Sequence, residues 1–211
     1  MNKEIEYKTN WLGEELSVKT GKLAKQADSA VLVQYGETVV LVTVVESQTE
    51  REGVDFFPLM VDVEEKLYAA GIIKGSKWVK REGRPSDDSV LTGRMVDRSI
   101  RPLFDQTGKK DVQVLISILA VDKKNDHDVI ALTAASIALS LNDITWNGPI
   151  CGIRVGRIAG EFIFNPTYEE RLQSDLDLII ASTKSKVIMI EAGANEINEA
   201  DMNKAIQAGH K

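Results

Sequence analysis

Three arginines along one predicted helix are the residues of this sequence best suited to bind an anion. Arg94, Arg98 and Arg101 lie at positions i, i+4 and i+7 of a helix predicted over residues 90–103, and therefore share one face. The planar guanidinium donates two hydrogen bonds to one phosphate and stays charged at physiological pH. Asp97 offsets part of the mutual repulsion. The spacing alone therefore leaves two interpretations open: a phosphate-binding face, or a solvated face paired with acidic neighbours.

A basic segment with one large aromatic residue precedes this helix. The run KGSKWVKREGRPS contains Trp78, followed by Lys80, Arg81 and Arg84, and its glycines permit a projecting loop. Aromatic rings stack on any base while Lys and Arg hold phosphates, which is how proteins bind single-stranded nucleic acid. An equally good alternative is that the tryptophan is tucked into the surface and the charges keep the loop soluble.

The basic residues are concentrated in this region of an otherwise acidic chain. Residues 72–101 carry eight basic and four acidic side chains, whereas the whole chain has a net charge of −6. That net charge argues against a nucleic-acid coat protein held on by total charge. Any nucleic acid is therefore expected at residues 72–101.

Other residues that could do chemistry are weaker candidates. Asp175, Asp177 and Glu191 could hold a divalent metal, but alternating acids on strands more often form a solvated face. His127 lies between two aspartates at a predicted helix start, where capping is the better interpretation than general base catalysis. A single cysteine excludes an intramolecular disulfide, and the sequence has no Walker or dinucleotide-binding glycine motif.

Clusters of strands interrupted by helices must position these side chains. Two β-branched runs that meet at Tyr35-Gly36 predict an antiparallel hairpin of residues 29–47. Further strands are predicted over residues 13–21, 57–65, 111–122, 150–165, 176–183 and 185–193. Helices are predicted over residues 90–103, with Ser89 as N-cap, over 128–141, apolar almost all round and therefore central, and over 196–207. This order favours an α+β fold in which helices pack on mainly antiparallel or mixed sheets.

The bulk composition predicts a soluble cytoplasmic protein. Hydrophobic residues make up 43% of the 211 positions, enough for a substantial buried core. The sequence has no apolar run of about 20 residues that could cross a bilayer, so no membrane partner is expected. The N-terminus mixes charges of both signs and does not resemble a secretory signal.

The runs AAGIIKGSKWVKREGRPS and RMVDRSIRPLF closely resemble the first core domain of the bacterial polynucleotide phosphorylase family. The resemblance continues through DVIALTAASIALSL, NGPICGIRVG, FNPT and LDLIIAST, and so covers essentially the whole chain. It implies one ribonuclease-PH-like domain over residues 1–211, a fragment of a longer multidomain chain. It further implies a homotrimeric ring that degrades single-stranded RNA from 3′ to 5′ by phosphorolysis to nucleoside diphosphates. Inorganic phosphate would be the co-substrate, Mg²⁺ the cofactor, and RNA-degradation complex proteins possible partners.

By this resemblance, the basic segment and the helix line an RNA channel. The family has two aromatics followed by two basic residues at the channel entrance, where this chain has Trp78, Val79, Lys80 and Arg81. Because Val79 replaces one aromatic, binding is expected to shift toward phosphate contacts. The RNA-binding residues implied are Trp78, Lys80, Arg81, Arg84, Arg94, Arg98 and Arg101.

The resemblance also implies that this core lacks a complete active site. The phosphate-binding serines of the family's second core are expected to correspond to residues 37–40, which hold two valines, and its active-site lysine to Ile179. We therefore expect no catalytic and no metal-binding residue here, with the active site and its Mg²⁺ in a second core. Two alternatives stay open: a non-catalytic RNA-binding or assembly subunit of an exosome-like ring, and weak phosphorolysis that uses Asp175 and Asp177.

Overall fold

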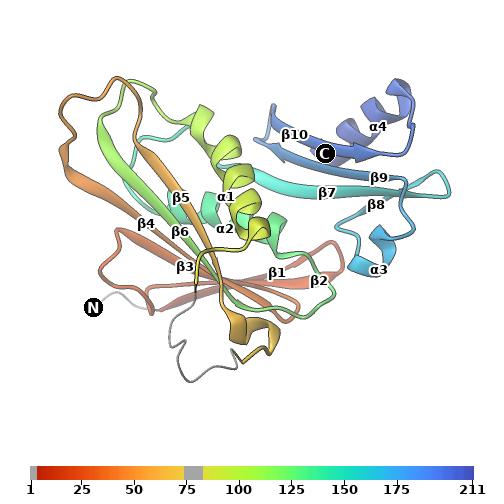
Figure 1. Cartoon of the computed structure of the whole chain (residues 1–211), viewed down its shortest axis with the longest axis horizontal. Coiled ribbons are helices and arrows are strands. Elements are labelled where there is room, and N and C mark those ends of the chain that lie inside the picture. Colours follow the sequence, from red (N-terminus) through yellow and green to blue (C-terminus); the bar gives the residue numbers. More distant parts are fainter. Residues whose placement is uncertain (1–3, 74–82) are drawn as a thin grey trace.

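A computed structural model describes residues 4–73 and 83–211 as two sheets with helices between and beside them (Figure 1). The first sheet has the strand order β1-β2-β3-β4-β6-β5. All its pairs are antiparallel except β5 with β6. Its strands are β1 (Ile5–Trp11), β2 (Glu14–Thr20), β3 (Ser29–Tyr35), β4 (Thr38–Glu50), β5 (Leu59–Glu65) and β6 (Lys110–Ala120). Strand β5 lies at one edge of this sheet.

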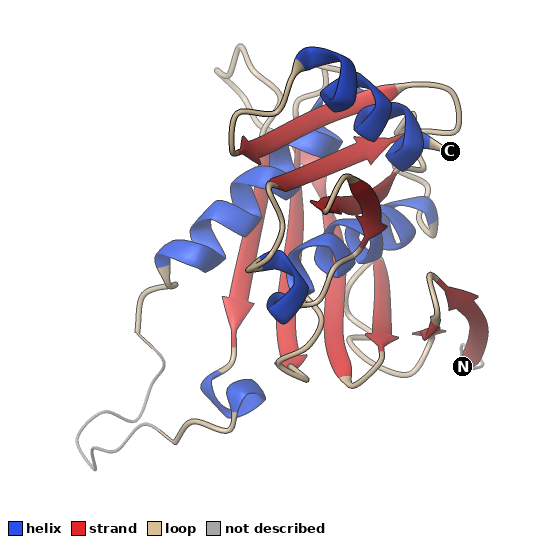
Figure 2. Cartoon of the chain, turned by 90° about the vertical axis from the view of Figure 1, so that its right-hand side faces the viewer, coloured by secondary structure: helices blue, strands red, loops and turns tan. Residues whose placement is uncertain are grey.

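The second sheet is antiparallel, with the order β10-β9-β7-β8. It comprises β7 (Cys151–Ile158), β8 (Glu161–Phe164), β9 (Leu176–Ser182) and β10 (Val187–Ala194). Helix α4 (Glu199–His210) packs on β7 and β9, and the short helix α3 (Tyr168–Arg171) precedes β9. In Figure 2 this sheet lies nearer the viewer, with the first sheet behind it. The predicted α+β class with mixed sheets is confirmed.

The predicted hairpin and central helix are both present. Tyr35 pairs with Thr38 across the two-residue turn between β3 and β4, where Gly36 takes a φ of +59°. Helix α2 (His127–Ser140) contacts β3 and β4 on one side and β7 on the other. A β carbon at Gly152 of β7 would lie 2.7 Å from a Leu132 methyl, so glycine permits the close approach of this strand to α2. Helix α2 carries apolar side chains on almost every side because it lies between the two sheets.

Helix α1 (Asp87–Ile100) begins earlier than predicted. Ser86, not Ser89, is its N-cap, because Ser86 is extended and its Oγ accepts a hydrogen bond of 3.0 Å from the Ser89 backbone N–H. The predicted end at residue 103 is a 3₁₀ turn, Arg101–Leu103. Helix α4 also starts later than predicted, after the Asn198 cap, because Glu196 has a left-handed φ of +56°.

Three elements were missed by the sequence prediction. Strand β1 does alternate, with Ile5, Tyr7 and Trp11 separated by polar residues, and the prediction overlooked this pattern; the strand is exposed along almost its whole length. The 3₁₀ helix η1 (Leu67–Ala70) and α3 span four residues each, too few for a periodic pattern. Within the part of the chain that the structure describes, no helix is long and apolar enough to cross a membrane.

Candidate functional site

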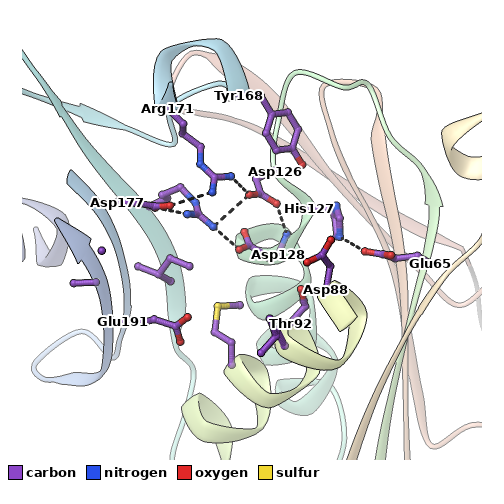
Figure 3. A pocket seen from close by; sticks show the side chains of 16 residues that line it. Glu65, Asp88, Thr92, Asp126, His127, Asp128, Tyr168, Arg171, Asp177 and Glu191 are labelled. Carbon is purple, nitrogen blue, oxygen red and sulfur yellow. Dashed lines mark hydrogen bonds and ion pairs between the residues drawn. The ribbon is translucent and has the colours of Figure 1, made fainter. Parts of the chain in front are cut away.

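Two neighbouring cavities contain the charged residues that the sequence singled out. The first, of about 470 Å³, lies between α1, the start of α2 and the second sheet, and we call it the acidic pocket (Figure 3). The second, of about 810 Å³, runs along α1 and the edge strand β5, and we call it the α1 groove. Glu191 of β10 lines both cavities and so marks where they meet.

The acidic pocket is lined by six carboxylates but only two arginines. Its charged and aromatic lining residues are Glu65, Asp88, Asp126, His127, Asp128, Arg154, Tyr168, Arg171, Asp177 and Glu191. Both arginines come from the second sheet and its short helix, whereas Asp126 and Asp128 come from the start of α2. The pocket therefore has an excess of negative charge and disfavours an anionic ligand.

Both arginines of this pocket are enclosed by aspartates. Arg154, which is 5% exposed, forms ion pairs with Asp126 at 3.3 Å, with Asp128 and with Asp177. Arg171 pairs with Asp126 and, at 3.0 Å, with Asp177. We call these five residues the ion cluster; its ion pairs are drawn in Figure 3. Since carboxylates already occupy both guanidiniums, neither is available to a phosphate without breaking ion pairs, which are buried on the Arg154 side and partly exposed at Arg171.

Burial changes the acid–base behaviour of the ion cluster. The pKa of Asp128 rises from 3.8 to about 6, because burial disfavours its charge and Asp126 repels it, while Arg154 opposes both effects. Burial also raises the pKa of the Tyr168 hydroxyl. The predicted capping role of His127 is wrong: Asp126 is the N-cap of α2, and its side chain accepts from the Asp128 backbone N–H. His127 instead contacts Glu65 of β5, with 3.0 Å between Nε2 and Oε1.

The three predicted helix arginines all line the α1 groove, but their contacts differ. Arg94 is exposed and makes no hydrogen bond or ion pair with any described residue. Arg98 donates to Glu191 across the boundary between the two cavities. Arg101 donates to both Asp97 oxygens at 2.6 and 2.9 Å, and to the backbone carbonyls of Phe57 and Leu59. Arg101 therefore connects α1 to the first residue of β5 and to the segment just before it.

The other predicted RNA-binding residues lie before α1. Arg84 is exposed, three residues before the helix, and lines neither cavity. Trp78, Lys80 and Arg81 lie outside the described residues. The structure thus brings Arg94, Arg98 and Arg101 together and leaves Arg84 apart from them.

The three acids considered for metal binding are each engaged with an arginine. Asp175 is bound by Arg157 through Nε at 3.0 Å and Nη2 at 2.7 Å, and this hydrogen bonding lowers the Asp175 pKa. Asp177 belongs to the ion cluster, and Glu191 pairs with Arg98. In residues 4–73 and 83–211, no group of three or more histidines, cysteines or carboxylates could hold a metal ion.

The two departures from the family's active core lie in different places. Ile179 lines the acidic pocket. Residues 37–40 do not: they form the turn and start of β4, and Val40 is fully buried in the core. Ile179 therefore contributes an apolar wall at the pocket, whereas the valines serve packing.

Sequence reasoning missed Arg154 and Arg171, the cations of the ion cluster. Arg154 lies two residues after Gly152 on β7 and so shares the face of the strand that is turned toward α2, where a buried arginine must find acids near the helix. The acid-flanked start of α2 was visible in the sequence, but the link between these segments was not. Arg171 lies on a helix of four residues, too short to indicate which way its side chain points.

Two models of one protein family together match nearly the whole chain. Residues 13–145 match the model of the 3′ exoribonuclease family, domain 1, and residues 148–211 match domain 2 of the same family. The solved structure of rice (Oryza sativa) Rrp46 has the same fold, with a TM-score of 0.73 over 92% of this chain and 86% of that chain, at 16% sequence identity.

Several similar proteins are named polyribonucleotide nucleotidyltransferase. The one from Heliobacterium modesticaldum is 50% identical over 94% of this chain and 28% of its own length. Those from Staphylococcus saprophyticus and Finegoldia magna are 52% and 50% identical over 97% and 100% of this chain, and 29% of theirs. The chain thus spans less than a third of the length of these relatives.

Proposed function

The chain belongs to the 3′ exoribonuclease family, and from this premise we propose that it forms the first ribonuclease-PH-type core, residues 1–211, of a polyribonucleotide nucleotidyltransferase. The proposed whole protein is a cytoplasmic homotrimer that degrades single-stranded RNA from 3′ to 5′, with inorganic phosphate as co-substrate and nucleoside diphosphates as products. Identities of 50–52% to proteins of that name support this over an exosome-like subunit, since the likeness to Rrp46 is one of fold.

Within that protein, this chain supplies RNA contacts rather than the phosphorolytic centre. The contrast between the two cavities carries this proposal. Arg94 stands exposed in the α1 groove, so it can meet a backbone phosphate without losing a partner. In the acidic pocket, aspartates enclose Arg154 and Arg171, and Ile179 supplies no charge to stabilise a phosphoryl transition state.

The residues of this chain do not fit the Mg²⁺ that the resemblance implies. Asp175, Asp177 and Glu191 each bind an arginine, and their carboxylates do not converge on one point among the described residues. A divalent cation there would have to displace these arginines, because Mg²⁺ requires several oxygen ligands in a near-octahedral arrangement. We therefore assign the metal, like the active site, to a second core.

Incubation of the purified chain with an oligoadenylate, Mg²⁺ and inorganic phosphate tests this division of labour. We expect the chain to bind the oligonucleotide, measured by fluorescence anisotropy, without releasing ADP, measured by chromatography. Accumulation of ADP would show that this core has its own phosphorolytic site. A lack of oligonucleotide binding would instead contradict the RNA-contact role.

A further inference from the structure

The α1 groove contains equal numbers of positive and negative side chains. Its charged lining residues are Arg94, Arg98, Arg101, Asp62, Asp97 and Glu191. RNA backbones bind largely through neutralisation of phosphates by Lys and Arg, so a groove with no net charge offers little attraction. If RNA occupies this groove as proposed above, an acid that competes with phosphate for an arginine must give way.

Asp97 is poorly placed to give way. Its carboxylate receives two hydrogen bonds from Arg101, and its side chain is 28% exposed. Arg101 is itself fixed by the carbonyls of Phe57 and Leu59, so separating this pair would also loosen α1. Asp62 forms no ion pair with the described residues and so does not compete for an arginine.

Glu191, in contrast to Asp97, can leave its arginine at little cost. Among the described residues it pairs with Arg98 alone, and the Glu191 and Arg98 side chains are 53% and 55% exposed. Exposed ion pairs of this kind contribute little stability, because water solvates both partners well once they separate. Met189, two residues before Glu191 on β10, keeps its sulfur 3.7 Å from Arg98 Nη2, so the guanidinium stays in contact with β10 through a second side chain.

We propose that Glu191 is a displaceable counter-ion that occupies Arg98 until an RNA phosphate replaces it. The inference rests on the proposed function and extends it. Arg94 binds phosphate directly, whereas Arg98, one turn further along α1, becomes available only when the Glu191 carboxylate moves into solvent. Glu191 thereby sets the affinity and the salt dependence of the groove.

Glu191→Gln tests this assignment, because it removes the competing charge and keeps the side-chain shape. Binding of a labelled oligoadenylate to the purified chain should tighten about two- to fivefold, the range expected from an exposed ion pair. The salt dependence should steepen by about 0.7 in slope, since Arg98 then binds phosphate without an ion returning to Glu191. Glu161→Gln on β8, at the opposite edge of the sheet, makes the same change in net charge and should leave both quantities unchanged.

The variant Arg98→Ala, alone and combined with Glu191→Gln, isolates the pair. Without Arg98, Glu191→Gln should have no effect beyond that of Glu161→Gln. Equal tightening by the two glutamine variants, or an effect of Glu191→Gln that survives in Arg98→Ala, would overturn the proposal. If Arg94→Ala weakens binding but Glu191→Gln does nothing, the counter-ion role alone fails; if Arg94→Ala does nothing either, the proposed RNA contact itself fails.

A second arm distinguishes the RNA backbone from free phosphate as the anion at Arg98. Inorganic phosphate is titrated against the bound oligoadenylate at constant ionic strength. We expect Glu191→Gln to strengthen oligoadenylate binding in phosphate-free buffer. Unchanged binding there, with stronger competition by inorganic phosphate, would overturn the assignment to RNA.

Discussion

The three arginines of α1 share one helix face, yet their side chains make different contacts. Arg94 makes no contact with a charged group among the described residues, Arg98 has one exposed partner, and Arg101 makes four hydrogen bonds. Arg101 already uses four of its five N–H donors on carboxylate and carbonyl oxygens, so it has little capacity left for a phosphate. The RNA contacts predicted for all three are therefore best retained for Arg94 and, conditionally, Arg98.

Arg94→Ala should therefore change RNA binding, whereas Arg101→Ala should change the stability of the chain. Arg94→Ala should weaken oligoadenylate binding and reduce the salt-dependence slope of that binding by about 0.7, because one phosphate contact is lost. The free energy of unfolding should not change, because no residue of the chain loses a partner. Arg101→Ala should lower the free energy of unfolding by about 1–3 kcal/mol, because carbonyl and carboxylate partners lose their donor. Urea denaturation and anisotropy measure the two quantities. A stability loss for Arg94→Ala would contradict this division.

Helix α1 as a whole determines which way these arginines point. Its buried residues, including Met95, Val96 and Ile100, pack on the protein side, so Arg94 and Arg98 are turned outward. The Ser86 cap fixes where the helix begins, and its Oγ also donates to Glu65 at the end of β5. The cap therefore ties the start of α1 to the edge strand that forms the other wall of the groove.

Removal of this cap should destabilise the chain. Ser86→Ala leaves the Ser89 backbone N–H without its acceptor, and should lower the free energy of unfolding by about 0.5–2 kcal/mol. Ser185→Ala, in the exposed turn between β9 and β10, is the matched control and should be neutral. Urea denaturation checks both variants. Equal stabilities would mean that another group caps α1.

At the scale of the whole molecule, the ion cluster joins the two halves of the chain. Asp126 and Asp128 belong to the half that matches family domain 1, and Arg154, Arg171 and Asp177 to the half that matches domain 2. Together with α2, which packs against both sheets, the cluster holds α1 opposite β10. The pairing of Arg98 with Glu191 depends on that arrangement.

This junction should make stability depend on pH between about 4 and 6. Because the Asp128 pKa is raised from 3.8 to about 6, the folded chain binds more protons there than the unfolded chain between these values. The contribution of Asp128 is therefore most favourable below about pH 4 and is lost as pH rises through about 6. The free energy of unfolding of Asp128→Asn, relative to the unmodified chain, should rise from pH 4 to 7. A difference that stays constant with pH would contradict the raised pKa.

Most local elements and the family resemblance follow from patterns that are visible in the sequence. Apolar alternation marked most strands, the α2 pattern indicated a central helix, and the arginine spacing put three cations on one face. These features depend on periodicity within a few residues. Strand β1 was overlooked although Ile5, Tyr7 and Trp11 alternate with polar residues, and α3 was missed because it is a single turn.

The partner of each charged side chain, in contrast, follows from how the elements pack together. Arg101 meets carbonyls more than 40 positions earlier, Arg98 on α1 meets Glu191 in the second sheet, and Arg154 meets acids from another element. Ion pairing depends on distances between residues remote in sequence, which no local pattern encodes. Three arginines that look equivalent in the sequence therefore differ in the folded chain: Arg94 is exposed, Arg98 forms one exposed ion pair, and Arg101 is bound to the start of β5.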